Sequence, residues 1–115
     1  MAKFLVLIYG DERTWAEAPA QWHEENGRRH AAFIEAAGAA VVGGNELAPT
    51  PSAVSVRADP EGLPVVTDGP FLESKEVVGG YYVLDRADRD EAVRLAMQIP
   101  EATAAVGGVE IRPVA

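Results

Sequence analysis

Two segments of this chain are apolar on both sides of a strand, and they restrict its possible folds more than any other feature. Residues 4–9, "FLVLIY", and residues 81–84, "YYVL", are continuous runs of strand-forming side chains without a charge. A strand of this composition is expected to be covered on both faces. The sequence therefore predicts a sheet that needs cover on two sides.

Helix and strand patterns place these two strands in a ferredoxin-like α+β fold. One helix is expected from near Pro19 to Gly38, because proline is tolerated in a first turn and glycine commonly ends a helix. A second helix is expected from the capping residues Asp88 and Glu91 to Pro100. The other predicted strands lie in residues 39–49, 53–59, 63–67 and 105–114. If an extra strand or hairpin is set aside, the order is β-α-β-β-α-β, the split βαβ arrangement.

Two helices can cover only one face of such a sheet. Right-handed crossovers place both helices on the same side, so the opposite face needs another cover. A second copy of the chain, packed sheet to sheet, is the simplest cover, and it predicts a homodimer of the dimeric α+β barrel type. The alternative is that the N- and C-terminal segments fold over this face.

The composition indicates one soluble domain over residues 1–115, which we expect to be cytoplasmic. Apolar residues make up 48% of the chain, and no apolar stretch approaches the roughly 20 residues that a membrane span needs. The absence of cysteine excludes disulfides and thiolate catalysis. A formal net charge of −8 would repel a nucleic-acid backbone, so we expect neither a nucleic-acid partner nor a membrane partner.

Seven side chains of the first predicted helix fall on one arc of about 120°, which should face the sheet. They are Trp22, His23, Asn26, His30, Phe33, Ile34 and Ala37. His30 lies near the middle of the arc, with Asn26 about one turn before it. If His30 acts as an acid or base, one ring nitrogen should reach an open cavity. If it is a core histidine, protein groups should occupy both nitrogens.

Neither a metal nor another cofactor is expected. His23 and His30 are seven residues apart, so about 10 Å separates them along the helix and they cannot share one ion. The chain also shows no nucleophile motif and no phosphate-binding loop.

Residues 68–76, "DGPFLESKE", form a loop that is longer than a tight hairpin requires. Loops of this size tend to bind a ligand or to be mobile. Phe71 must pack against something to be ordered. Glu73, Lys75 and Glu76 bring three ionisable groups to the entrance of the next strand. The alternative to a binding role is a solvated charged rim.

The tetrapeptide Asp68-Gly69-Pro70-Phe71 resembles the motif that names the DGPF branch of the YCII-related proteins. The segments "LVLIYGDE", "GGNELAP" and "VEIRPV", in this order along the chain, also resemble blocks of that family. The resemblance implies a ferredoxin-like dimer with sheets packed face to face. It further implies a His–Asp pair in a cleft at the dimer, for which Asp68 matches the motif aspartate and His30 is the candidate histidine.

Two functions of different classes follow, and whether the protein is an enzyme stays open. In the first, it binds or transforms a small polar molecule in a pocket between the first helix and the loop, with His30 as acid or base and Asp68 as its partner. The candidate binding residues are Asn26, Phe71, Glu73, Lys75, Glu76 and Tyr81. In the second, it is a non-catalytic dimeric module. The resemblance links that module to regulation of extracytoplasmic-function sigma factors. In this sequence, His23 or Gly27 could also occupy the position that corresponds to the helix histidine of the family.

Overall fold

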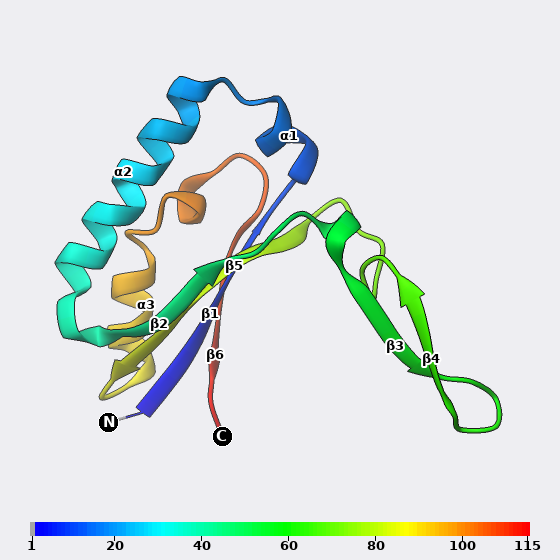
Figure 1. The fold of residues 1–115 in the computed structure, drawn as a ribbon. Coiled ribbons are helices and arrows are strands. Elements are labelled where there is room, and N and C mark those ends of the chain that lie inside the picture. Colours follow the sequence, from blue (N-terminus) through cyan, green and yellow to red (C-terminus); the bar gives the residue numbers. More distant parts are fainter. Residues whose placement is uncertain (1) are drawn as a thin grey trace.

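The computed structural model describes residues 2–115 and contains a four-stranded antiparallel sheet in the order β2-β5-β1-β6 (Figure 1). The strands span Ala2–Gly10 (β1), Val41–Glu46 (β2), Val77–Arg86 (β5) and Gly108–Pro113 (β6). β5 lies between β1 and β2, and β1 lies between β5 and β6, so each βαβ unit is split by one inserted strand. The predicted ferredoxin-like α+β fold is confirmed.

The helices span Glu12–Glu17 (α1), Ala20–Ala37 (α2) and Arg89–Ala96 (α3). α2 follows Pro19 and ends at Gly38, whose φ of 55° suits glycine. Asp88 caps α3 by accepting a hydrogen bond from the Glu91 backbone N–H at 2.9 Å, as the capping pattern predicts. α3 ends earlier than predicted, and Pro100 begins a 3-10 turn over Pro100–Thr103. None of the helices in the described chain is long and apolar enough to span a bilayer.

α1 was not predicted, because its segment contains no apolar repeat. Asp11 begins this helix by accepting hydrogen bonds from the backbone N–H groups of Arg13 and Thr14 at 2.9 and 3.4 Å. Glu12 then accepts bonds from the Thr50 backbone N–H and hydroxyl, both at 2.6 Å, which ties α1 to the connection after β2. A cap and one tertiary contact therefore stabilise a helix that local propensity does not indicate.

The extra element is a hairpin that projects from the body of the molecule (Figure 1). Its strands, Val54–Ala58 (β3) and Pro64–Asp68 (β4), form a separate two-stranded sheet. The loop after Asp68 therefore does not join two neighbouring strands of one sheet. It carries the chain from the hairpin back to β5, and this explains its length.

The core lies between the sheet and the two long helices. Every second residue of β1 points into it, and β5 contributes Tyr82 and Leu84 in the same way. The buried apolar residues are Phe4, Val6, Ile8, Phe33, Ala37, Ala40, Tyr82, Leu84, Ala92, Ala96 and Ile99. Because these side chains come from both helices and from one face of the sheet, both helices lie on the same side, as predicted.

The other face of the sheet has no helix over it (Figure 1). Leu5 and Leu7 of β1 stand opposite Val83 and Tyr81 of β5 on this face, and all four are only partly buried. The ends of the described chain do not fold over this face, because residues 2–10 and 108–113 are themselves strands of the sheet. Within the described residues, the alternative in which the termini cover this face is therefore wrong.

Candidate functional site

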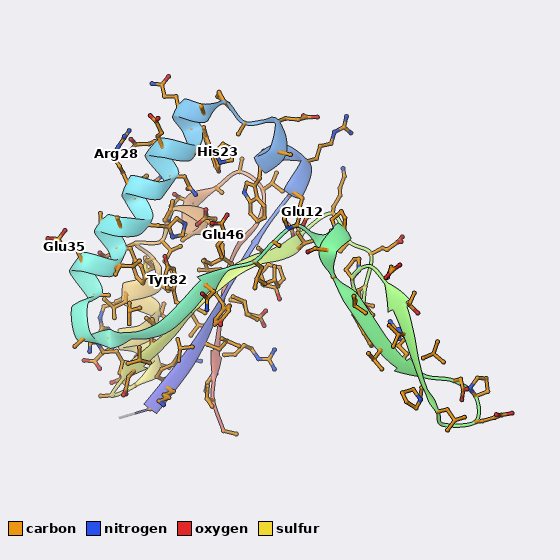
Figure 2. The ribbon with its side chains drawn as sticks, in the orientation of Figure 1. Glu12, His23, Arg28, Glu35, Glu46 and Tyr82 are labelled. Carbon is orange, nitrogen blue, oxygen red and sulfur yellow. The ribbon has the colours of Figure 1, made fainter. Side chains whose placement is uncertain are left out.

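A cavity of about 550 Å³ lies between α2 and the adjoining edge of the sheet. Its lining residues come from α2 (Trp22, His23, Asn26, Gly27, His30, Ile34), β2 (Gly44, Asn45, Glu46), β5 (Gly79, Gly80, Tyr81, Tyr82), and from Ile8, Trp15 and Glu101. Figure 2 shows His23 on the helix and Glu46 at the end of β2, on opposite sides of the space between helix and sheet. The site is thus a pocket with one helical wall and a floor of β-sheet.

The predicted inward arc of α2 is divided between the core and this pocket. Phe33 and Ala37 are buried in the core. His30 and Asn26 are half-buried and line the pocket, as does Ile34, which is 45% exposed. One face of α2 therefore anchors the helix at its C-terminal end and presents the pocket residues before it.

Trp15 of α1 closes one side of the pocket by lying against two glycines. A Cβ atom added to Gly10 or to Gly79 would collide with the Trp15 indole. The register of β1 against β5 also shifts between Ile8 and Tyr9, beside Gly79. At Gly79 the strand therefore contains a bulge, and the missing side chain leaves room for the Trp15 ring.

The pocket contains a chain of three polar side chains, Glu101, His30 and Tyr82. His30 Nδ1 lies 2.7 Å from the Tyr82 hydroxyl, and His30 Nε2 lies 2.7 Å from Glu101 Oε1. A carboxylate only accepts, so the proton of a neutral His30 belongs on Nε2, and Tyr82 donates to Nδ1. Both ring nitrogens are therefore occupied by protein groups, which is the arrangement expected of a core histidine. His30 nevertheless lines the cavity, with 21% of its side chain exposed.

Glu101 is the one buried polar or charged residue among residues 2–115, with 7% of its side chain exposed. Burial by itself would raise the pKa of Glu101. However, His30, a backbone N–H of Glu101 itself and the Asn26 amide stabilise the carboxylate, and they hold its pKa below the ordinary value. Glu101 is therefore ionised at neutral pH and can stabilise positive charge on His30.

The Tyr82 hydroxyl is the last group of this chain, and Tyr82 lines the pocket. Burial raises the pKa of Tyr82, and the negative charge of Glu101 raises it further. Tyr82 therefore stays protonated over the physiological range. It can give its proton to His30 only if it receives another from a bound molecule at the same time.

Asp68 does not approach His30 within one chain. It ends β4 at the root of the hairpin, where the next residue, Gly69, bonds to Ala53 and accepts from the Ser55 hydroxyl at 2.7 Å. Neither Asp68 nor any residue of the loop up to Glu76 lines the pocket. A single chain thus does not bring Asp68 to His30, because β4 pairs with β3 and leads away from α2.

The other loop residues also lie outside the pocket. The Arg57 guanidinium lies 3.6 Å from the centre of the Phe71 ring and donates to the Phe71 carbonyl at 2.8 Å. Glu76 accepts a bond from the Gly107 backbone N–H at 3.0 Å, which ties the loop to the start of β6. Glu73 and Lys75 are exposed. Of the predicted binding residues, only Asn26 and Tyr81 line the pocket.

Sequence reasoning missed Glu101, Glu46 and Trp15. A signal for Glu101 exists, since it is the only charged residue between Arg94 and Glu110, in a stretch of apolar and small residues. An isolated carboxylate in such a stretch is often paired and buried. Its partner His30 could not be identified, because the two are far apart in sequence and only the fold brings them together.

Within residues 2–115 no group of three or more His, Asp or Glu side chains is arranged to hold a metal ion. The two histidines of the pocket are on the same helix and have different neighbours. His23 packs edge to face against Trp22, with 5.0 Å between ring centres, whereas His30 lies between Glu101 and Tyr82.

Comparison with known proteins gives a family for the whole described chain. Residues 2–115 match the YCII-related domain. The chain is also similar to an uncharacterized protein of Rhizobium meliloti (strain 1021), with 32% identity over 120 residues that cover 97% of this chain and 91% of the relative. Both matches extend over the helices, the sheet and the hairpin described above. The chain belongs to the YCII-related domain family.

Proposed function

We propose that this protein binds a small polar molecule in the pocket between α2 and the sheet and moves a proton to or from it. The observation that carries the proposal is the contact chain from buried Glu101 through His30 to the Tyr82 hydroxyl in the cavity. A nucleophile or base that is backed by a histidine, which is itself backed by a carboxylate, is a recurring arrangement for proton transfer.

The raised pKa of Tyr82 decides how such a transfer would proceed. A free tyrosinate is unfavourable beside Glu101. When the bound molecule gives a proton to the Tyr82 oxygen, Tyr82 therefore passes its own proton to His30 Nδ1 in the same step. Glu101 stabilises the imidazolium that results. In the reverse direction the imidazolium returns its proton to Tyr82, which then acts as an acid toward the ligand.

The test is a set of matched variants in a binding and turnover screen of small polar molecules. Tyr82→Phe removes only the hydroxyl, and His30→Gln keeps polarity and approximate size. For any molecule that the wild type transforms, we expect each variant to lower the rate by about 10²-fold or more, the usual contribution of a general acid or base. Steady-state rates and binding isotherms would measure both effects.

Asp68→Asn is the control for this experiment. It removes a carboxylate that is exposed at the hairpin root and keeps the turn preference. We expect it to leave both binding and rate unchanged. The opposite pattern, a large loss with Asp68→Asn and none with Tyr82→Phe, would contradict the proposal and restore the pair implied by the DGPF motif.

A second candidate function is a dimeric interaction module, and the hairpin favours it. Val54, Val56 and Val66 lie on one face of this hairpin and are 59%, 56% and 67% exposed. An isolated two-stranded hairpin is only marginally stable in water. We propose that a second copy covers the helix-free sheet face and this hairpin face. A two-fold arrangement leaves neither apolar surface open on either copy.

Light scattering would test the dimer. We expect a mass of about twice the chain mass of 12.2 kDa at micromolar concentration. Leu7→Lys, on the helix-free face, should reduce this mass to that of one chain, because a buried lysine at a sheet interface is unpaired. Met97→Lys adds the same charge on the helix side and should leave the mass unchanged. A wild-type mass near 12.2 kDa would rule out the dimer.

A further inference from the structure

We infer that the pocket selects a small organic cation, such as a quaternary or protonated amine with an apolar body. This inference rests on the proposed pocket and adds the chemical class of its ligand. It depends on three properties of the lining: its charge, its aromatic rings and the burial of one carboxylate.

The charged groups of the lining favour a cation. Glu46 and Glu101 contribute carboxylates, and no lysine or arginine of residues 2–115 lines the pocket. On α2, Arg28 is held by Glu25 through bonds of 2.6 and 3.2 Å on the exposed side of the helix. An anionic ligand would meet like charge and neither a lysine nor an arginine, whereas a cation would be attracted.

The aromatic rings supply the second attraction. Trp15, Trp22 and Tyr82 line the cavity. The face of an aromatic ring attracts a cation, and tryptophan does so most strongly. Rings from α1, α2 and β5 surround one space, so a compact cation can contact more than one of them. Their carbon surfaces also suit the apolar body of an alkylammonium ion.

Glu101 provides the third observation. Only 7% of its side chain is exposed, and the residue lines the pocket. Its Oε1 already accepts from His30 Nε2 at 2.7 Å, so the carboxylate acts on a ligand through its charge and not through a free acceptor. A negative charge that is buried beside the cavity favours a positively charged ligand.

Intrinsic fluorescence is a direct probe, because the chain has two tryptophans and both line the pocket. Three ligands of nearly the same shape differ in charge: choline, the neutral 3,3-dimethylbutan-1-ol and the anionic 3,3-dimethylbutanoate. We expect choline to change the fluorescence with a Kd about tenfold or more below that of the alcohol. The carboxylate should bind more weakly than the alcohol.

Each outcome is informative. If the alcohol or the carboxylate binds as tightly as choline, the inferred charge preference is wrong while the pocket and the proton relay remain. If none of the three changes the fluorescence or produces heat by calorimetry, the cavity does not bind ligands of this size. In that case the proposed function fails together with the inference.

A pair of variants distinguishes the effect of the charges in the pocket lining from the effect of the overall net charge of −8. Glu46→Gln removes one charge from the lining, and Glu61→Gln removes one from the exposed turn of the hairpin. We expect Glu46→Gln to reduce the ratio of choline affinity to alcohol affinity about fivefold, the effect of one nearby charge at partial solvent exposure. Glu61→Gln should not change the ratio. Equal effects of both variants would assign the preference to the whole surface and overturn the inference.

Discussion

Replacing Phe33 with alanine is expected to lower the free energy of unfolding by about 3–5 kcal/mol. The ring is 2% exposed and packs against Tyr82, with 4.9 Å between the ring centres. α2 is 18 residues long, yet Phe33 and Ala37 are its only buried residues. Removing this ring therefore leaves a cavity and detaches most of the helix from the sheet.

Chemical denaturation, followed by circular dichroism, would measure this loss. Ile34→Ala is the matched control, since it truncates the neighbouring residue of the same helix. Ile34 is 45% exposed, so we expect a loss of about 1 kcal/mol or less. Similar losses for the two variants would show that Phe33 does not anchor α2.

Replacing His30 with leucine is expected to destabilise the protein by about 3 kcal/mol at neutral pH, because a buried charge loses its hydrogen-bond partner. The Glu101 carboxylate would remain buried without the imidazole that contacts it. The Tyr82 hydroxyl would also lose its partner. The double variant His30→Leu/Glu101→Leu should recover most of the loss, because apolar residues replace the whole pair.

The pH dependence of this variant follows from the pKa of Glu101. In the wild type that pKa is lowered, so the unfolded state takes up the proton more readily. The stability that the carboxylate contributes is thus present above the ordinary value of 4.5 and is lost as the pH falls through the folded-state pKa.

In His30→Leu, burial acts without the imidazole, so the pKa of Glu101 should be raised. The difference in stability from the wild type should then shrink as the pH falls toward about 4. Denaturation curves at several pH values would measure it. A difference that is constant with pH would show that lost packing, not an unpaired charge, causes the destabilisation.

The sequence was sufficient for the main elements of the fold because each has a local physical cause. The apolar runs specify β1 and β5, Pro19 and Gly38 bound α2, and Asp88 caps α3. α1 was missed because a cap and a contact with Thr50 stabilise it, and the latter is not local. The extra hairpin was predicted, but its separation from the main sheet was not. Nothing in "LPVVT" indicates that this strand forms no pair with β5.

The candidate site could be predicted only in part for the same reason. The helical period places His30 and Asn26 toward the sheet, and both line the pocket. The acidic partner of His30 depends on where the segment after α3 crosses the sheet, and no spacing rule gives that position. Asp68 was chosen from a motif. The residues of that motif instead close the root of the hairpin, because Gly69 accepts from Ser55 and Phe71 accepts from Arg57.

The division of one helix face between core and pocket affects how such a protein can evolve. Trp22 and Ile34 are 39% and 45% exposed and belong to the pocket, whereas Phe33 and Ala37 hold the helix in place. Mutations of these two exposed residues change the ligand surface with little loss of stability. Single substitutions at these positions of α2 can therefore change ligand specificity without compensating substitutions elsewhere. Among related proteins, we expect these positions to vary with the ligand and the core positions to stay apolar.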